Sequence, residues 1–481
     1  MIEPSATLPV EPLTPEAMDR IHDQAMRILE EIGTEVHFEP ALQLLGSAGQ
    51  RVDGTRVRWD AGFVMDQLAK APATIGLTGR DPSRVVRLGG GSLAHSPVGG
   101  PPFAYDRERG RRDGTIADHV ELVKIAHASD VLPLMQSGTT EAQDLEHTSR
   151  HLEMDYSVLR WSGRPYIIYG TSGPKARDAI ALAAIAAGGM AALAANPGII
   201  GIVNPNSPLV WDELMVDMLM SCAEAAQPVA ITPFLLAGAS APVTLAAGLS
   251  LLVAETLAGV AMAQLVRPGA PCIFGCFFNG VDMRSGGPSL GLPESVLTTL
   301  AGSQLARRYG LPLRGGGGLC SSIALDAQAA TESTMSLWTT YLAKCDLVVH
   351  SAGWLEGGLT ASYEKLALDV ETIRMFERIR AGLVVDDEQL AYDAIFEVGP
   401  GGLFLAHEHT LERFRTDSFM SPLFRSQAYP TWVKQGSRTT DVMATDQWKV
   451  LLDSYEDPGI DPGLDAELRE FVDRRTIELD A

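Results

Sequence analysis

The sequence predicts an α/β protein, a TIM-type (β/α)8 barrel with an N-terminal cap and a C-terminal helical extension. Short apolar runs recur through the middle of the chain, each ending in small, polar or aromatic residues: 132–138, 165–170, 198–206, 228–234, 270–279, 311–318 and 347–353. Segments with helical patterning separate them, for example 175–187, 212–226, 242–266, 293–309 and 327–343. This alternation implies right-handed crossovers and a parallel sheet, and the number of units approaches the eight that close a barrel.

The eighth strand has the weakest pattern. Residues 90–99 can supply it, although this segment lacks a long apolar core. A doubly wound open sheet is the alternative that the pattern leaves open. The chain has 481 residues and a minimal barrel needs about 250, so extensions must wrap around the barrel.

Three domains are expected along the chain. Residues 1–90 form a cap, with one helix over 15–33 between the N-cap Thr14 and the stop Gly33, a second helix over 40–49, and a hairpin turn at Asp53-Gly54. Residues 91–381 form the catalytic barrel, whose last helix spans 362–379. Residues 382–481 form a mainly helical extension packed on the barrel, with a polar loop at 429–440.

Composition limits the classes of partner and compartment. The formal net charge of −22 argues against nucleic acid and anionic membranes as partners. The five cysteines have no zinc-type spacing, so neither a disulfide framework nor a metal site is supported. The N-terminal sequence lacks the pattern of a signal peptide, and we expect a cytoplasmic protein.

The segment 242–266 is apolar nearly all round. Such a helix is buried in the core or lies in an oligomer interface, and a membrane span is a further possibility. Glu255 in its middle favours a buried helix over a membrane span. We expect the chain to form a homo-oligomer.

The run 347–353 carries the strongest candidate site. Its aliphatic residues end at His350, and Trp354 and Glu356 follow directly. Ligands bind where parallel barrel strands end, so this histidine is the candidate catalytic residue. The alternative is a histidine that only satisfies a neighbouring backbone carbonyl.

Three motifs resemble the trimethylamine methyltransferase superfamily. They are Gly99-Gly100-Pro101-Pro102-Phe103-Ala104-Tyr105-Asp106 with Arg111-Arg112, the run 315–318 leading to Asp326-Ala327-Gln328-Ala329, and Ser351-Ala352-Gly353 through Ser362-Tyr363-Glu364-Lys365. The likeness extends over nearly the whole chain. It implies a TIM barrel that transfers a methyl group from an amine to the cobalt of a corrinoid (cobalamin), which a separate small corrinoid-binding protein carries.

The chain departs from the founding trimethylamine enzymes of this superfamily in one respect. The resemblance places their pyrrolysine near residues 318–322, and this sequence contains only standard residues. Members without pyrrolysine are similar to betaine methyltransferases, which act on quaternary amines such as glycine betaine. A quaternary nitrogen already carries the charge that lets a neutral amine leave, so attack by Co(I) on its methyl group needs neither a general acid nor a covalent activating group.

A quaternary ammonium group cannot donate a hydrogen bond, and proteins recognise it through aromatic faces and diffuse negative charge. Aromatic residues at or near strand ends or in the entry loop are expected to form the cage: Phe103, Tyr105, Tyr169, Phe234, Phe277 and Trp354. Asp106 and Glu356 would add negative charge. Residues able to bind a substrate carboxylate or hold the substrate in line with cobalt are Asn204, Asn279, Arg314 and His350.

Glycines near two strand ends are candidates for close approach to a planar corrin: Gly315, Gly316 and Gly317, with Ser351 and Gly353. A flexible turn is the alternative. We expect no protein-bound metal.

Two other functions compete with methyl transfer. One is a different barrel enzyme, such as a lyase, which would ordinarily want a Schiff-base lysine or metal-binding carboxylates at strand ends. The other is a barrel that binds betaines without chemistry. An open catalytic face favours methyl transfer over binding alone.

Overall fold

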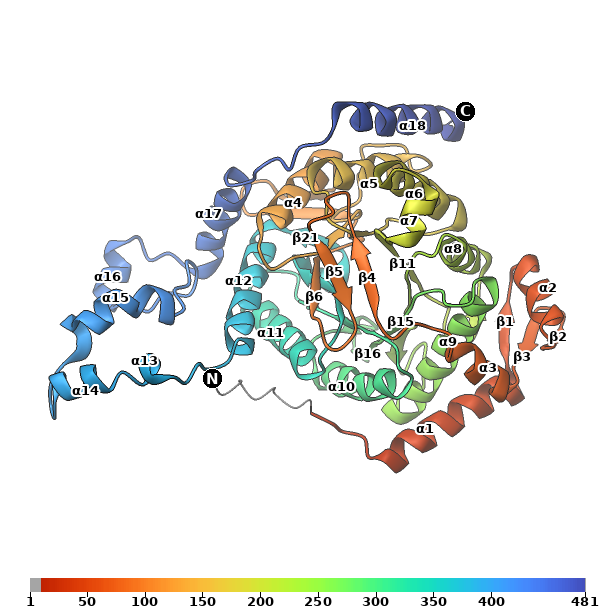
Figure 1. Cartoon of the computed structure of the whole chain (residues 1–481), viewed down its shortest axis with the longest axis horizontal. Helices are drawn as coiled ribbons and strands as arrows, with labels where there is room; N and C mark the ends of the chain where they lie inside the picture. Colours follow the sequence, from red (N-terminus) through yellow and green to blue (C-terminus); the bar gives the residue numbers. More distant parts are fainter. Residues whose placement is uncertain (1–9, 481) are drawn as a thin grey trace.

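The computed structural model describes residues 10–480, and its centre is an eight-stranded parallel barrel (Figure 1). Neighbouring strands pair in parallel, and the backbone N–H of Leu134 donates to the carbonyl of His95 at 3.2 Å across the closing seam. The strands in chain order are β6 (Ala94–Pro97), β9 (Met135–Gln136), β10 (Tyr166–Ile167), β11 (Ile199–Val203), β13 (Val229–Ile231), β15 (Cys272–Gly275), β18 (Leu313–Gly316) and β19 (Leu347–Ala352). The predicted barrel is confirmed.

Strand β6 is the eighth strand expected within residues 90–99. It pairs with β19, where Val348 lies opposite His95. Its short polar sequence lies between β19 and β9, which close the circle and exclude the open-sheet alternative.

Helices surround the barrel and begin at residues that the sequence marks as caps. Asp212, Asp326 and Ser362 each accept a hydrogen bond from a backbone N–H of the first turn. The barrel helices are α4 (Ile116–Ala128), α5 (Arg150–Trp161), α6 (Gly173–Ala187), α7 (Met190–Ala195), α8 (Glu213–Glu224), α9 (Leu245–Val266), α10 (Pro293–Arg308), α11 (Ala327–Leu342) and α12 (Tyr363–Arg380).

Helix α9 is the apolar segment for which a membrane span was considered. Among residues 10–480 it is the one helix long and apolar enough to cross a membrane, and 83% of its most apolar window is buried inside the protein. Helices α1 (Pro15–Arg27) and α3 (Ala61–Leu68) of the N-terminal cap pack against it. It is a core helix.

The N-terminal cap follows the predicted order. Thr14 accepts a hydrogen bond from the N–H of Ala17 at the start of α1, and Gly33, with φ of 78°, ends the helical segment after a π-helical turn (Ile28–Ile32). A Cβ at Gly33 would meet the carbonyl of Val57, so glycine is required there. The remaining elements are β1 (Thr34–Val36), α2 (Glu39–Ser47), β2 (Arg51–Asp53) and β3 (Arg56–Arg58).

A hairpin closes one end of the barrel. Strands β4 (Ile75–Thr78) and β5 (Val85–Leu88) cross the barrel in the centre of Figure 1. Ile75, Leu77 and Leu88 form one buried cluster with barrel residues such as Ile167 and Ile273. The hairpin therefore forms a floor, and access is left to the opposite end.

Short strands lie beyond the barrel strands on the catalytic side. Two apolar runs predicted as single strands, 228–234 and 270–279, each divide into a barrel strand and a second strand, because β14 and β16 pair with each other in a separate sheet. One extra sheet contains β14 (Phe234–Ala237), β16 (Phe277–Val281) and β17 (Pro288–Ser289). The other contains β20 (Trp354–Leu355), β21 (Thr360–Ser362), β7 (Phe103–Asp106) and β8 (Gly110–Asp113).

The C-terminal extension has two parts. Helices α17 (Thr440–Asp453) and α18 (Pro462–Asp480) pack on the barrel helices, whereas α13 (Asp387–Leu390), α14 (Tyr392–Val398), α15 (Glu408–Asp417) and α16 (Tyr429–Lys434) extend away from it at the left of Figure 1. The expectation that the whole extension packs on the barrel therefore describes only α17 and α18. The expected loop at 429–440 is wrong in its first half, because residues 429–434 form α16 with a proline in its first turn.

Candidate functional site

A cavity of about 700 Å³ lies where the barrel strands end, opposite the hairpin floor. Phe234, 41% exposed, lies at its lining, so the cavity opens to solvent. The sequence-predicted residues that line it are Tyr169, Asn204, Phe234, Phe277, Arg314, His350 and Trp354. They come from six different strand ends of the barrel, as a TIM-barrel site requires.

His350 is held in one orientation and one protonation state. The backbone N–H of Gly99 donates to its Nδ1 at 3.2 Å. Burial and the neighbouring Arg314 cation hold the pKa of His350 well below its usual value. The imidazole is therefore neutral near pH 7, and because Nδ1 accepts a hydrogen bond, the ring proton lies on Nε2.

The backbone of His350 is also unusual. Its φ of 61° is uncommon for a residue other than glycine. The register between β19 and β6 shifts between Val348 and Ala352, so this bulge places His350 at the cavity rather than in the regular barrel wall. Its ring centroid lies 4.5 Å from that of Trp354.

Aromatic rings cover the cavity wall. Phe234 and Phe277, on β14 and β16, have ring centroids 5.1 Å apart. Trp354 lies beside His350, and its Nε1 is buried without a hydrogen-bond partner among the described residues. The Nζ atom of Lys175 lies 5.9 Å from the ring centroid of Tyr169, so part of that ring already faces a protein cation.

Arg314 brings a positive charge into this apolar wall. Its side chain is 3% exposed, and its guanidinium lies over the Phe277 ring at 4.9 Å from the centroid. Burial lowers the pKa of Arg314 to about 10, so the group stays protonated near pH 7. Within residues 10–480 no carboxylate pairs with it, and its Nε and Nη1 atoms have no hydrogen-bond partner.

Polar residues fix one side of the cavity. The Tyr169 hydroxyl donates to Glu141 at 2.8 Å, and Arg150 donates to the same carboxylate at 2.8 Å. Asn204 donates its amide Nδ2 to the carbonyl of Thr232 at 2.5 Å. This amide is therefore engaged by the barrel, which limits what Asn204 offers to a ligand.

Glu255 of α9 holds the cavity loop that follows β11. Its carboxylate accepts hydrogen bonds from the Ser207 hydroxyl at 2.7 Å and the Leu209 N–H at 2.6 Å. Burial raises the pKa of Glu255 to about 7. Glu255, the residue that argued against a membrane span, thus holds in place a loop that forms part of the cavity wall.

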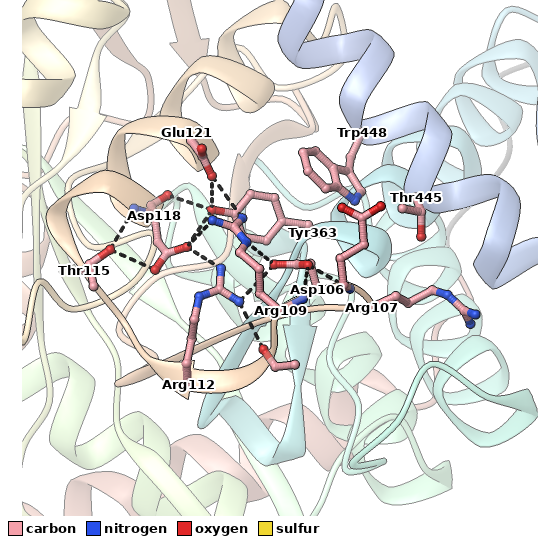
Figure 2. A network of polar contacts seen from close by, with 12 residues as sticks. Asp106, Arg107, Arg109, Arg112, Thr115, Asp118, Glu121, Tyr363, Thr445 and Trp448 are labelled. Atoms are coloured by element: carbon pink, nitrogen blue, oxygen red, sulfur yellow. Dashed lines mark hydrogen bonds and ion pairs between the residues drawn. The ribbon is translucent and has the colours of Figure 1, made fainter.

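The entry-loop candidates lie outside the cavity. Phe103 packs under the guanidinium of Arg111, 3.6 Å from its ring centroid. The carboxylate of Asp106 accepts hydrogen bonds from Arg109 Nε at 2.6 Å and Arg112 Nη1 at 2.9 Å. Figure 2 shows this network joining β7, β8 and α4 to Tyr363 of α12.

The same network corrects two expectations. Asp106 is neutralised by arginines, so it adds no free negative charge to a cage. Tyr105, its neighbour on β7, does not line the cavity either. The network attaches the β7–β8 hairpin to α4 and α12. Glu364 of α12 extends these contacts to α17, because it accepts a hydrogen bond from Trp448 Nε1 at 3.0 Å.

Asn279 and Glu356 also lie elsewhere. The Asn279 side chain is buried and accepts from the Ser295 hydroxyl at 2.6 Å. Glu356 forms an ion pair with Arg111 at 2.8 Å and lines a separate hollow of about 710 Å³. Local apolar patterning placed them after strands but gave no information on their partners.

The glycines expected near a corrin pack against the protein. A Cβ at Gly315 would meet Cys345 Sγ at 2.7 Å, one at Gly316 would meet Leu319 at 2.4 Å, and one at Gly317 would meet the Ser351 backbone at 2.4 Å. The Ser351 hydroxyl is hydrogen bonded to His95 at 2.9 Å. These contacts explain the small residues by close packing, and their placement does not support corrin contact.

A buried ion pair lies behind these loops. Lys365 Nζ donates to Asp369 at 2.6 Å and to the Gly318 carbonyl at 3.1 Å. Asp369 also accepts from the N–H of Gly353 at 3.0 Å. The pair thereby fixes the segments on either side of His350 from outside the cavity.

Sequence reasoning missed several cavity residues. Gln136 and Thr232 are polar residues at the ends of predicted strands, which was the available signal. Gly99 was quoted only as part of a motif, yet it both bonds to His350 and lies so close to Gln136 that a Cβ would meet that side chain at 2.7 Å. Asn206 ends the predicted run 198–206 and carried the same signal, whereas Ser207 and Ser240 come from loops with no strand signal.

Comparison with known proteins gives consistent similarities. The profile of the trimethylamine methyltransferase (MTTB) family matches residues 4–480. The glycine betaine methyltransferase of Desulfitobacterium hafniense (strain Y51) is 38% identical over 467 residues, covering 97% of each chain. The proline betaine:corrinoid methyltransferase of Eubacterium limosum is 30% identical over 424 residues, covering 85% of this chain and 86% of its own.

A solved structure shares the fold. The monomethylamine methyltransferase of Methanosarcina barkeri superposes with a TM-score of 0.55 at 11% identity, covering 96% of this chain and 88% of that one. At this identity the likeness concerns the architecture alone.

Proposed function

Because the chain belongs to the trimethylamine methyltransferase family, we propose that it transfers a methyl group from a quaternary amine to the Co(I) of a corrinoid carried by a separate small protein. Both the amine and the corrinoid are substrates in this reaction. The relatives named for glycine betaine and proline betaine support an amine of the betaine class.

In this reaction Co(I) supplies an electron pair to the methyl carbon from the side opposite nitrogen. The cobalt–carbon bond forms as the carbon–nitrogen bond breaks, and the bonding pair stays on nitrogen. A neutral tertiary amine leaves without a proton, and the cobalt becomes methyl-Co(III). The protein therefore has to bind and orient the amine and exclude water.

The observation that carries the proposal is the composition of the cavity wall. Aromatic rings suited to a quaternary ammonium group line a cavity that opens at the catalytic end of the barrel. His350 is neutral and does not repel the cationic substrate. A substrate site open at this end can be reached by cobalt, which favours methyl transfer over binding alone.

The segment 318–322, where the resemblance places the pyrrolysine of the trimethylamine enzymes, supports a reaction that does not use that residue. Cys320 donates to the Trp354 carbonyl at 3.0 Å, and the N–H of Ser321 donates to Glu332 at 2.7 Å. Neither residue lines the cavity. A lyase is less well supported, because no described lysine lines this cavity to form a Schiff base.

The direct test combines the purified chain, cob(I)alamin and one amine at a time, with methyl-Co(III) followed by visible absorbance. Glycine betaine should methylate cobalt, and trimethylamine should not. Turnover of trimethylamine without any quaternary substrate would contradict the subclass, and binding of betaine without cobalt methylation would favour the binding protein. The chain alone should not retain a corrin through gel filtration.

We also propose a cytoplasmic location. Co(I) persists only under reducing conditions, and the described cysteines, Cys222, Cys272, Cys276, Cys320 and Cys345, are all buried and free.

We propose that the chain forms a homo-oligomer through residues 382–438. Six large apolar or aromatic residues of this segment are between 72% and 77% exposed: Leu383, Tyr392, Phe396, Leu403, Leu405 and Tyr429. Exposed apolar surface of this density is typical of an interface. Light scattering after gel filtration should show an oligomer that Phe396→Asp with Leu405→Asp dissociates; a wild-type monomer at every concentration would contradict the proposal.

A further inference from the structure

Within the described residues, Arg314 is buried in the cavity wall without a partner of opposite charge. It comes from β18 and is 3% exposed. Buried arginines are normally paired with carboxylates or fully hydrogen bonded, because removing a charge from water is costly. Its Nε and Nη1 have neither kind of partner among residues 10–480.

The surroundings of Arg314 leave its charge uncompensated. The groups that approach it are the Phe277 ring, the thiols of Cys276 and Cys345, and the neutral His350. The described carboxylates near the catalytic end are engaged elsewhere: Glu141 with Arg150, Asp106 with Arg109 and Arg112, and Glu356 with Arg111. A ligand is the remaining source of negative charge.

The unpartnered groups of the cavity form two kinds of site. The aromatic side chains of Phe234 and Trp354 suit a quaternary ammonium, whereas the guanidinium of Arg314 suits an anion with two oxygens. A molecule that carries a trimethylammonium group and a carboxylate a few atoms apart satisfies both.

We propose that Arg314 binds the carboxylate of the amine substrate and thereby restricts the enzyme to carboxylate-bearing quaternary amines. This inference rests on the proposed function and names the residue that determines its substrate class. Choline, which has the same trimethylammonium head but a hydroxyl group in place of the carboxylate, would leave Arg314 buried and unpaired. The neutral His350, with its proton on Nε2, can donate a second hydrogen bond to the same carboxylate.

The test measures binding by calorimetry without any corrinoid, using glycine betaine and choline as the probes. Wild type should bind glycine betaine and should bind choline much more weakly. Arg314→Gln should weaken glycine betaine binding roughly hundredfold, because a charged partner is lost, and should leave choline binding within about twofold. Arg314→Lys should recover only part of the loss, since it keeps the charge without the planar fork.

Stability provides a second, independent measurement. Arg314→Met replaces an unpaired buried charge by an apolar group of similar length, so its melting temperature without ligand should equal or exceed that of wild type. The matched control is Arg307→Gln, a surface arginine of α10 that pairs with Glu11 and should leave both affinities unchanged.

The outcomes separate this inference from the proposed function. Equal loss of glycine betaine and choline binding in Arg314→Gln, or a wild type that prefers choline, would overturn the role of Arg314, as would a large fall in melting temperature in Arg314→Met. Binding of glycine betaine that depends on Arg314, without any methylation of cobalt, would contradict the methyltransferase and leave the carboxylate site standing.

Discussion

The N–H of Gly99 donates to Nδ1 of His350 across 3.2 Å, and this contact joins the loop after β6 to the end of β19. It sets the tautomer of the imidazole, because a nitrogen that accepts this bond carries no proton. The neutral ring can then donate from Nε2 into the cavity. The first and last strands of the barrel together determine the chemistry of one side chain.

We expect His350→Ala to lower methyl transfer about hundredfold while the fold remains intact, because misplacing reacting atoms by about 1 Å has effects of this size. His350→Asn is the matched variant, since asparagine tolerates the positive φ and can accept from Gly99. It should keep the wild-type melting temperature and still lose activity. A variant with a lowered melting temperature but normal turnover per folded molecule would return His350 to a structural role.

Removal of an aromatic wall should weaken binding of the ammonium group. Trp354→Leu keeps an apolar side chain but removes the π face, so the Kd for glycine betaine should rise about 2–30-fold, equivalent to about 0.5–2 kcal/mol. Calorimetry measures this change. Phe103→Leu is the control outside the cavity, and an equal effect of both substitutions would argue against a cation–π wall.

Glu255 should make stability depend on pH. Burial raises its pKa from 4.5 to about 7, so the folded protein holds this proton more tightly than the unfolded chain. The resulting stability is fully present below pH 4.5 and is lost as the pH rises through 7.

Glu255→Gln removes this dependence. The free energy of unfolding of the variant relative to wild type should therefore increase by about 2–3 kcal/mol between pH 4.5 and 8. Urea unfolding at both pH values measures the difference, with the exposed Glu224→Gln as the control on the neighbouring helix. A pH-independent difference would show that Glu255 does not titrate in this range.

The floor hairpin should contribute stability without contributing affinity. Leu77→Ala deletes a side chain that is fully buried against the barrel interior, and its cost should be about 2–5 kcal/mol. Val85→Ala on the paired strand is the matched control, because Val85 is 59% exposed. The Kd for glycine betaine should be unchanged in both variants, and weaker binding in Leu77→Ala would show that the floor shapes the site.

The barrel could be predicted because buried parallel strands and their crossover helices leave a local pattern. Even β6 was placed, although its sequence Ala94-His95-Ser96-Pro97 is polar. The short strands β14 and β16 were not separated from the barrel strands before them, since no periodicity marks where an apolar run leaves one sheet and enters another. The extension was expected to be helical, but the protrusion of α13–α16 from the barrel was not foreseen, because the sequence does not say whether an apolar helical face meets the barrel.

Residues that line the cavity could be predicted where a side chain lies within or directly after a barrel strand, as for His350, Arg314 and Asn204. The prediction failed where the role of a side chain depends on partners that lie far from it in the sequence. Asp106 is neutralised by Arg109 and Arg112, and this pairing becomes visible only when the β7–β8 hairpin is folded.

The hairpin β4–β5 closes one end of the barrel, so within residues 10–480 the cavity opens at the opposite end. In the proposed reaction the amine and the cobalt use this same opening, and a docked corrinoid protein would cover it. The amine would then have to bind before the acceptor arrives, and the demethylated product would leave only after the acceptor has departed. Such a compulsory order predicts that excess corrinoid protein slows turnover by trapping empty or product-filled enzyme, a kinetic signature that originates in a hairpin remote from the chemistry.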